Sequence, residues 1–232
     1  MGSDCREAGS HTHLRAPVTT HDLLLFDLDG TLTDPIEGIG RSINFALKAA
    51  GHEERTLADL ARFIGPPLDE TFAELVGSAD AEVIAALVAS YRERFGDVGY
   101  AENLVYPGIR EALETLRERG ARMAICTSKR RDFADKILRL FDLREHFLFI
   151  SGGDVGISKW QQIEALRVDG LVSSDSVMIG DRGVDITAAH RNGLTAAAVL
   201  WGYGPREELE REDPRYVLAS PDELATRLVP RF

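Results

Sequence analysis

The sequence predicts an α/β fold: a doubly wound parallel sheet with an all-helical domain inserted after its first strand. Residues 23–26 are all apolar, as expected of a strand in a parallel sheet that helices cover on both faces. From residue 107 to the C-terminus, strand-length apolar runs alternate with helical patterns, which favours a parallel, doubly wound sheet. The intervening block is helical, without a convincing strand. We therefore expect residues 21–33 and 107–232 to form the core and residues 34–106 to form the helical insert.

The inserted block contains one strongly patterned helix and three weaker ones. Apolar residues recur at helical spacing from Ile36 to Ala50, and Gly51 is placed to end that helix. Further helical segments are expected around residues 57–63, 69–76 and 81–95. The chain thus completes a helical domain before the strands of the core resume.

The remaining core elements follow in alternating order. Helices are expected at residues 109–119, 133–141, 160–167 and 186–191. Strands are expected at residues 122–127, 147–150, 177–179, 195–200 and near 216–218. A C-terminal helix completes the fold, with Pro221 at or near its first turn, where a missing N–H costs little.

Net charge and composition argue against some classes of partner and indicate where the protein is located. The 232 residues carry a formal net charge of −11, which argues against nucleic acid or an anionic membrane as the main partner. No apolar run approaches transmembrane length, and no signal-peptide core is present. Two cysteines, Cys5 and Cys126, cannot form a disulfide framework, so a cytoplasmic location is expected. Residues 1–20 are polar and aperiodic, and we expect them to be disordered.

The most informative motif follows the first strand directly. Asp27 and Asp29 lie two residues apart at the strand end, so their side chains point the same way. Gly30 beside them permits a sharp turn and a close approach of backbone amides to a ligand. Ligands of open α/β sheets bind at the carboxyl ends of strands. Two acids there could hold a hard cation, or divide the roles of nucleophile and general acid/base; a turn with a capping aspartate is the alternative.

Three further motifs follow in chain order. They are Thr127 and Ser128 at the end of a second strand, Lys159 after a glycine-rich loop, and Asp181 at the end of a third strand with Asp185 four residues on. Together with the aspartate pair, they resemble the haloacid dehalogenase superfamily of phosphotransferases. The pattern of that superfamily is Asp-x-Asp-x-Thr, then Thr or Ser at a strand end, then Lys, then Gly-Asp-x-x-x-Asp. All four motifs match in order, and the resemblance extends from about residue 21 to the C-terminus.

The resemblance implies a phosphoryl-transfer mechanism for the two aspartates. Asp27 would be the nucleophile that forms an aspartyl-phosphate, which splits one difficult displacement into two easier ones. Asp29 would be the general acid that protonates the leaving alkoxide, and then the base for the water that hydrolyses the intermediate. The resemblance, and not the spacing, assigns these two roles.

The same resemblance implies Mg²⁺ as the cofactor. Asp27, the backbone carbonyl of Asp29 and Asp181 would be the protein ligands, and Asp185 would orient a metal-bound water. Mg²⁺ prefers near-octahedral oxygen coordination and retains several waters. An alternative interpretation of Asp185 is an acid in the first turn of a helix, where it satisfies the helix dipole.

Four residues are expected to bind the transferred phosphate. Thr127 would donate from its hydroxyl, helped by the backbone amides of Ser128 and Gly30, and such a hydroxyl can also cap a helix. Lys159 would offset the charge of the nucleophile and of the phosphate. Lys129 is an alternative donor to the phosphate, but the arginine next to it favours the interpretation of Lys129 as a surface charge.

The helical insert resembles the cap domain of the phosphoglycolate phosphatase and 5′-nucleotidase-like branch. Arg41 and Asn44 share a helix face opposite the apolar stripe, a face that is either solvated or in contact with substrate. Pro66 and Pro67 stiffen a turn that could project into the active site, similar to the substrate-reading loop of that branch. The loop at residues 201–204 also resembles that branch.

The leading hypothesis is a Mg²⁺-dependent phosphomonoester hydrolase of a small metabolite, with 2-phosphoglycolate and 5′-nucleotides as first candidates. A sugar phosphomutase of the same fold is the alternative. A dehalogenase is disfavoured because it needs neither Asp29 as an acid nor a metal held by Asp181. The intact motif set disfavours a binding module without activity. We expect a monomer or a weak homodimer that binds neither a membrane nor a nucleic acid polymer.

Overall fold

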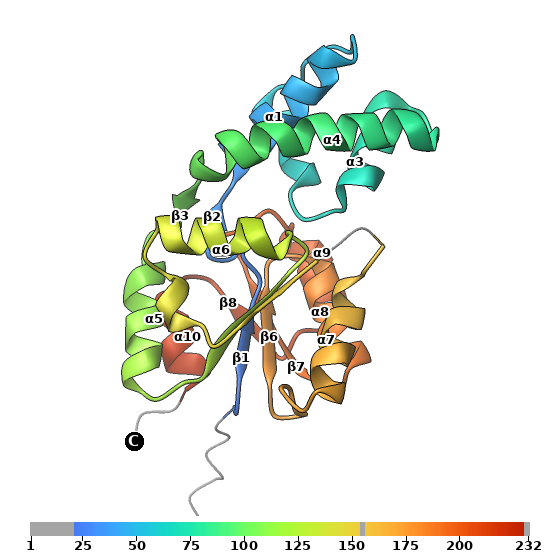
Figure 1. Cartoon of the computed structure of the whole chain (residues 1–232). Helices are drawn as coiled ribbons and strands as arrows, with labels where there is room; N and C mark the ends of the chain where they lie inside the picture. The colour runs from blue at the N-terminus through green and yellow to red at the C-terminus, as the bar shows by residue number, and fades with distance from the viewer. Residues whose placement is uncertain (1–20, 154–155, 230–232) are drawn as a thin grey trace, which may run out of the picture.

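The structure is a computed structural model that describes residues 21–153 and 156–229. The expected disordered tail, residues 1–20, lies outside these ranges. No helix within them is both long enough and apolar enough to cross a bilayer. Figure 1 shows an α/β core with its sheet at the centre and a helical cap above the upper edge of that sheet. The cap therefore faces the strand ends at which the sequence motifs lie.

The core sheet has six strands, all parallel, in the order β5-β4-β1-β6-β7-β8. Their bounds are Leu24–Phe26 (β1), Met123–Thr127 (β4), Ile150–Gly152 (β5), Val177–Gly180 (β6), Thr195–Val199 (β7) and Tyr216–Leu218 (β8). The strand order reverses at β1, which lies between β4 and β6. Crevices at such a reversal, outside the carboxyl ends, are where α/β sheets bind ligands.

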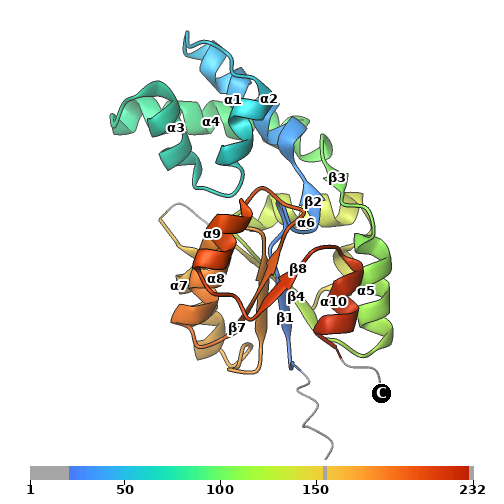
Figure 2. The ribbon, with the colours of Figure 1, turned by 180° about the vertical axis from the view of Figure 1, so that it is seen from behind.

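Alternating side chains of the central strands enter two apolar clusters, one on each face of the sheet. Phe26 and Ile125 belong to the cluster under α5, α6 and α10, whereas Leu25 and Cys126 belong to the cluster under α7, α8 and α9. These helices span Ile109–Glu118 (α5), Arg131–Leu140 (α6), Lys159–Val168 (α7), Gly183–Arg191 (α8), Arg206–Arg211 (α9) and Asp222–Arg227 (α10). Figures 1 and 2 show one set on each side of the sheet, which confirms the predicted doubly wound core.

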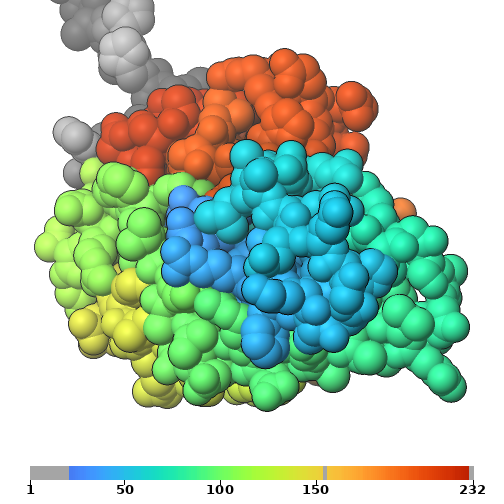
Figure 3. Space-filling model, turned by 90° about the horizontal axis from the view of Figure 1, so that it is seen from above, coloured from blue at the N-terminus to red at the C-terminus, as the bar shows by residue number. Residues whose placement is uncertain are grey.

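The cap consists of helices from the inserted block. They span Ile36–Ala49 (α1), Leu57–Leu60 (α2), Leu68–Val76 (α3) and Ala81–Asp97 (α4). α1 packs on α4, and both supply buried apolar side chains, such as Ile43 and Phe95, to the cluster shared with the core. Asp80 caps α4 by accepting hydrogen bonds from the backbone N–H groups of Glu82 and Val83. Seen from above, the cap lies over the core, whose segments show at its margins (Figure 3).

Two short strands join the cap to the core, where an all-helical insert was expected. Thr33–Asp34 (β2) and Leu104–Val105 (β3) pair antiparallel, with Thr33 opposite Val105. Strands of two residues carry no periodicity, so no sequence pattern reveals them. Because the chain crosses between core and cap only through this strand pair in the described residues, we propose the pair as the hinge of the cap.

The expected elements differ from the structure in three further places. The segment expected as a helix at 57–63 is one α-helical turn followed by a 3₁₀ turn, Ala61–Phe63. The edge strand expected at 147–150 lies further along the chain, at Ile150–Gly152 (β5). Before it, the N–H of Leu148 already donates a hydrogen bond to the carbonyl of Met123. Helix α9 was not expected, because five of its six residues are charged and one leucine makes no apolar stripe.

Candidate active site

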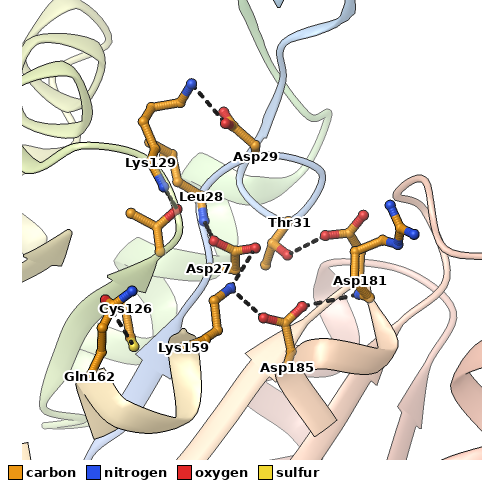
Figure 4. Close-up of polar contacts among 12 residues, drawn as sticks. Asp27, Leu28, Asp29, Thr31, Cys126, Lys129, Lys159, Gln162, Asp181 and Asp185 are labelled. Atoms are coloured by element: carbon orange, nitrogen blue, oxygen red, sulfur yellow. Dashed lines mark hydrogen bonds and ion pairs between the residues drawn. The ribbon is translucent and has the colours of Figure 1, made fainter. Parts of the chain in front are cut away.

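The polar residues of the motifs meet at the carboxyl edge of the sheet (Figure 4). Asp27 follows β1, Thr127 ends β4 and Asp181 follows β6, so the parallel register of these strands brings them together. Lys159 enters from the first turn of α7, and Asp185 from the first turn of α8. All five side chains are buried, and buried polar groups need partners inside the protein.

Lys159 is the charge partner of two of the acids. Its Nζ lies 2.9 Å from Oδ2 of Asp27 and also forms an ion pair with Asp185. Burial lowers the pKa of Lys159, but the charges of Asp185 and Asp27 outweigh burial, so this pKa is raised overall. The other oxygen of Asp27 accepts a hydrogen bond from the N–H of Leu28 at 2.7 Å. Lys159 is therefore a fixed cation beside an oriented carboxylate.

Three carboxylates form a buried cluster that fits a divalent cation. One oxygen from each of Asp27, Asp181 and Asp185 lies within 4.8 Å of the others. Burial, and then the charges of Asp185 and Asp27, raise the pKa of Asp181 to about 8. Burial also raises the pKa of Asp185, although Lys159 opposes this. One lysine cannot neutralise three carboxylates, and buried oxygen donors with excess negative charge suit a hard cation such as Mg²⁺.

Two hydrogen bonds and two glycines hold the carboxylate of Asp181 in one place. Oδ1 accepts a hydrogen bond from the hydroxyl of Thr31 at 3.1 Å, and Oδ2 accepts one from the N–H of Tyr203 at 2.8 Å. A Cβ at Gly30 would lie 2.2 Å from Oδ2, and a Cβ at Gly202 would lie 2.3 Å from the Asp181 Cβ. Gly30 also has a φ of +82°. Only residues without a side chain fit at these two positions.

Three of the four residues expected to bind phosphate line one cavity together with Asp27 and Asp29. They are Thr127, Ser128 and Lys159. Gly30 is placed differently, because its N–H donates to the carbonyl of Thr33 at 2.8 Å. We therefore do not retain the Gly30 amide as a phosphate donor, and its place beside Asp181 explains the glycine instead.

Asp29 stands apart from the three-carboxylate cluster and pairs with Lys129 (Figure 4). Lys129 Nζ lies 2.8 Å from Oδ2 of Asp29, and the two side chains are only 7% and 11% exposed. The expectation that Lys129 is a surface charge is wrong; the neighbouring Arg130 is the more exposed residue. Burial raises the pKa of Asp29, although Lys129 opposes this. Oδ1 of Asp29 is buried and has no hydrogen-bond partner among the described residues.

The cap closes a cavity of about 620 Å³ over these residues. Pro66 and Pro67 line the cavity, but Arg41 and Asn44 do not. Arg41 forms ion pairs with two glutamates at 2.7 and 2.9 Å. Asn44 exchanges two hydrogen bonds of 2.8 Å with the backbone of a neighbouring cap loop. Both side chains support the cap itself, so we do not retain them as substrate-binding residues.

Two residues that connect the core to the cap were not singled out in the sequence. The guanidinium of Arg182 donates to the carbonyl of Ile64, just before the proline turn of the cap. The hydroxyl of Tyr203 donates to Asp34 in β2. The loop at 201–204 was expected near the site and does lie there, but only the structure reveals the partners of these side chains.

Comparison with known proteins agrees with this geometry. The family model of the haloacid dehalogenase-like hydrolases matches residues 24–199. A 5′-nucleotidase of Pseudomonas aeruginosa is 42% identical over 200 residues, which cover 84% of this chain and 90% of that protein. A phosphoglycolate phosphatase of Aliivibrio fischeri is 29% identical, over 84% of this chain and 91% of that protein.

Two further comparisons extend the likeness. The tyrosine-protein kinase PtkA of Mycobacterium tuberculosis is 35% identical over 98% of this chain and 80% of that protein. The crystal structure of a predicted phosphatase from Clostridium acetobutylicum superposes with a TM-score of 0.83 at 36% identity, and covers 88% of this chain and 96% of that one. The likeness therefore includes the cap as well as the core.

Proposed function

We propose that this chain, which belongs to the haloacid dehalogenase-like hydrolase family and is a phosphatase, hydrolyses a small phosphomonoester. The reaction proceeds through an aspartyl-phosphate on Asp27. The observation that carries the proposal is that each aspartate of the first motif has its own lysine. Lys159 lies 2.9 Å from Asp27, and Lys129 lies 2.8 Å from Asp29. Two acids two residues apart thus have different surroundings, as two different roles require.

In the first half-reaction, an oxygen of Asp27 attacks phosphorus, and the bond from phosphorus to the leaving oxygen breaks. Asp29 gives its proton to that leaving oxygen, so the product departs as an alcohol. The hydroxyl of Thr127 and the backbone N–H of Ser128 bind the equatorial oxygens, and Lys159 offsets their charge. Positioning and electrostatic stabilisation supply most of the catalysis in phosphoryl transfer.

In the second half-reaction, Asp29 takes a proton from a water molecule as that water attacks phosphorus. The bond between phosphorus and Asp27 breaks, and inorganic phosphate leaves. Asp29 is then protonated again and ready for the next substrate, so the two steps balance in protons. The role of Asp29 in both steps requires a carboxyl group at the cavity, and Asp29 is one of the residues that line it.

We propose Mg²⁺ as the metal, held by Asp27 and Asp181 with the backbone carbonyl of Asp29, and supported by Asp185. When bound, Mg²⁺ supplies positive charge against the charge that develops on the phosphoryl oxygens. The chain's own residues keep the donor oxygens together. Thr31 and Tyr203 orient Asp181, and the excess of carboxylates over lysines in the cluster supports the assignment.

The cavity supports two candidate substrates, 5′-nucleotides and 2-phosphoglycolate, which correspond to the names of two relatives. Its volume of about 620 Å³ is ample for a nucleoside monophosphate. Phe63 and Tyr91 on the cap side could contact a base. Arg92, also on the cap side, could pair with the carboxylate of 2-phosphoglycolate.

The test is phosphate release from a panel of phosphomonoesters, with Mg²⁺ and with EDTA. The panel contains 5′-nucleotides, 2-phosphoglycolate and sugar phosphates. We expect metal-dependent release that is abolished in Asp27→Asn and retained in Asp132→Asn, a surface aspartate. The ranking of kcat/KM names the substrate class. Isomerised sugar phosphate without free phosphate would instead establish the phosphomutase alternative, and transfer from ATP to tyrosine would establish an activity like that named for the mycobacterial relative.

A further inference from the structure

Lys129 touches the core and the cap at once. Its Nζ lies 2.8 Å from Oδ2 of Asp29 and 4.3 Å from the centroid of the Phe95 ring. Its backbone N–H donates to the hydroxyl oxygen of Thr127 at 3.3 Å, which fixes where the side chain starts. The side chain is 7% exposed, so a carboxylate and a ring face replace much of the water that an ammonium group would otherwise bind.

Phe95 belongs to the cap and marks its position over the core. It lies on α4, stacks on Tyr91 of the same helix with centroids 5.4 Å apart, and meets Phe133 of core helix α6 edge-on at 5.2 Å. Gly96 allows this approach, because a Cβ there would lie 3.3 Å from the Phe133 ring. If α4 moved away from α6, the Phe95 ring would leave the ammonium group of Lys129, and water would replace it.

Asp29 relies on Lys129 for its orientation. Lys129 holds Oδ2, whereas Oδ1 has no partner in the described part of the chain. The terminal torsion of an aspartate is broad, so one ion pair orients the carboxyl group only if the partner itself is held in place. The placement matters, because a misplacement of about 1 Å can cost about 10²-fold in rate.

We propose that Lys129 is a positioning residue that couples the position of the cap to the placement of Asp29. The ring of Phe95 holds the ammonium group of Lys129, and the ammonium group holds the carboxyl group. The inference rests on the proposed function, in which Asp29 exchanges a proton with the leaving oxygen. It means that Asp29 is correctly placed when the cap is closed, and loosely held when the cap is open.

The chain offers a matched control for this pair of contacts. Lys136, on α6 of the core, has its Nζ 5.1 Å from the centroid of the Tyr100 ring, which lies in the 3₁₀ turn Gly99–Ala101 that follows α4. This pair likewise joins a lysine of the core to an aromatic ring of the inserted segment. Lys136 has no ion pair with an acid among the described residues. Lys136→Met therefore removes a similar contact without touching Asp29.

The experiment compares Lys129→Met, Lys129→Arg, Phe95→Leu and Lys136→Met on two substrates. One is the best alkyl phosphate of the panel, whose leaving oxygen needs a proton. The other is p-nitrophenyl phosphate, whose leaving group departs readily without one. Hydrolysis of the aspartyl-phosphate is common to both substrates and also uses Asp29, so the comparison is of kcat/KM, which reports the steps up to departure of the leaving group. For Lys129→Met we expect kcat/KM on the alkyl phosphate to fall by about 10²-fold, with a much smaller fall on p-nitrophenyl phosphate.

The other variants decide whether Lys129 positions the carboxyl group of Asp29 or only holds the cap on the core. Phe95→Leu should lower kcat/KM in the same substrate-dependent way as Lys129→Met. Lys129→Arg should recover part of the loss, because a guanidinium stays charged and stacks on a ring. Lys136→Met should leave kcat/KM unchanged on both substrates. Equal losses on both substrates in Lys129→Met, or the same substrate-dependent loss in Lys136→Met, would overturn the proposal.

A structural measurement separates this inference from the proposed function. If the wild-type protein releases no phosphate from any member of the panel, the proposed function fails. Crystal structures of the wild-type protein, Lys129→Met and Phe95→Leu still test the inference. We expect the carboxyl group of Asp29 to turn away from the cavity in both variants while Asp27 keeps its place. An Asp29 that superposes on the wild-type position in both variants would overturn the inference.

Discussion

The hydroxyl of Tyr203 donates a hydrogen bond to Oδ1 of Asp34, which lies in the strand pair between core and cap. The backbone N–H of the same tyrosine donates to Oδ2 of Asp181 at 2.8 Å. Tyr203 therefore connects a carboxylate of the proposed metal site with the proposed hinge. Hydrogen bonds to carboxylates are among the stronger ones in proteins, so this contact is a suitable target for mutation.

Tyr203→Phe removes the hydroxyl and leaves the backbone N–H to Asp181 in place. A hydrogen bond to a charged group contributes about 1.5–3 kcal/mol, so we expect the free energy of unfolding in urea to fall by an amount in that range. Tyr216→Phe is the control, because the hydroxyl of Tyr216 lies 3.4 Å from Nε2 of His21 and has no carboxylate partner within residues 21–153 and 156–229. Equal losses in the two variants would contradict the prediction.

Glu102 predicts a pH dependence of stability near the hinge. It accepts hydrogen bonds from Arg94 at 2.8 and 3.1 Å and from Arg41 at 2.9 Å. The bond from Arg94 is the main reason why the pKa of Glu102 is lowered, and burial opposes it. An unfolded glutamate has a pKa of about 4.3. The ion pairs therefore stabilise the fold above that pH, and this contribution is lost as the pH falls through the lower, folded value.

We therefore expect Glu102→Gln to destabilise the protein most at neutral pH. The difference in the free energy of unfolding between wild type and variant should shrink as the pH falls below about 4. Urea titrations at a series of pH values measure it. Glu93→Gln serves as the control, since Glu93 is an exposed residue of α4. A difference for Glu102→Gln that stays constant down to the lowest pH would refute this role of the ion pairs.

The core of the site could be predicted from the sequence because three of the four motifs lie at the end of an apolar strand. Asp27, Thr127 and Asp181 each follow or end such a run, and parallel strands bring their carboxyl ends to one edge. The three side chains meet because β1 lies between β4 and β6, and this strand order comes from the structure. Lys159 lies on a helix, so only the order of motifs in the family indicated it.

The contacts between core and cap could not be predicted in this way. Lys129 has charged neighbours in the sequence, which suggested a surface residue, whereas its partners Asp29 and Phe95 come from distant segments. Arg41 and Asn44 show the same difficulty. Helical periodicity identifies the apolar side of α1, but it does not reveal whether substrate, solvent or other cap residues meet the polar side.

The carboxylate cluster predicts a metal response that depends on Asp181. We expect Mg²⁺ to raise the melting temperature of the wild-type protein relative to EDTA, and to leave that of Asp181→Asn nearly unchanged. Metal at 100 times its Kd stabilises by about 2.7 kcal/mol, which corresponds to about 5–10 °C for a chain of this size. Without metal, Asp181→Asn should be more stable than wild type, because it removes one of three crowded carboxylates.

Differential scanning fluorimetry measures both effects. Asp169→Asn is the matched control, since Asp169 is an exposed aspartate at the end of α7, and its Mg²⁺ response should equal that of the wild type. The Thr31 hydroxyl can donate or accept a hydrogen bond, so the asparagine amide remains partnered. A Mg²⁺ shift of wild-type size in Asp181→Asn would mean that the metal binds elsewhere.

Arg182 links the proposed metal site to the proline turn of the cap, which lines the cavity. Its guanidinium donates to the carbonyl of Ile64 and pairs with Glu208, with Nε 3.1 Å from Oε1. Gly65 follows Ile64 and packs against the same side chain, because a Cβ there would lie 3.2 Å from the Arg182 Cγ. Pro66, the next residue, lines the cavity. Arg182 thus fixes the start of the proline turn against the core.

Arg182→Ala should weaken substrate binding more than it slows the chemistry. The variant keeps the backbone N–H that Arg182 donates to Asp185 at 3.0 Å, so the carboxylate cluster keeps its support while the proline turn loses its anchor. Loss of a charge-assisted hydrogen bond costs about 1.5–3 kcal/mol, and we expect KM to rise by about tenfold or more with kcat within a factor of a few.

Arg206→Ala is the control, because Arg206 lies on the same helix as Glu208 and pairs only with the exposed Glu210 among the described residues. Arg182→Lys should recover only part of the loss, since one ammonium group cannot reproduce the planar fork that reaches both a carbonyl and a carboxylate. A fall in kcat with an unchanged KM would show instead that Arg182 acts on the carboxylates and not on the cap.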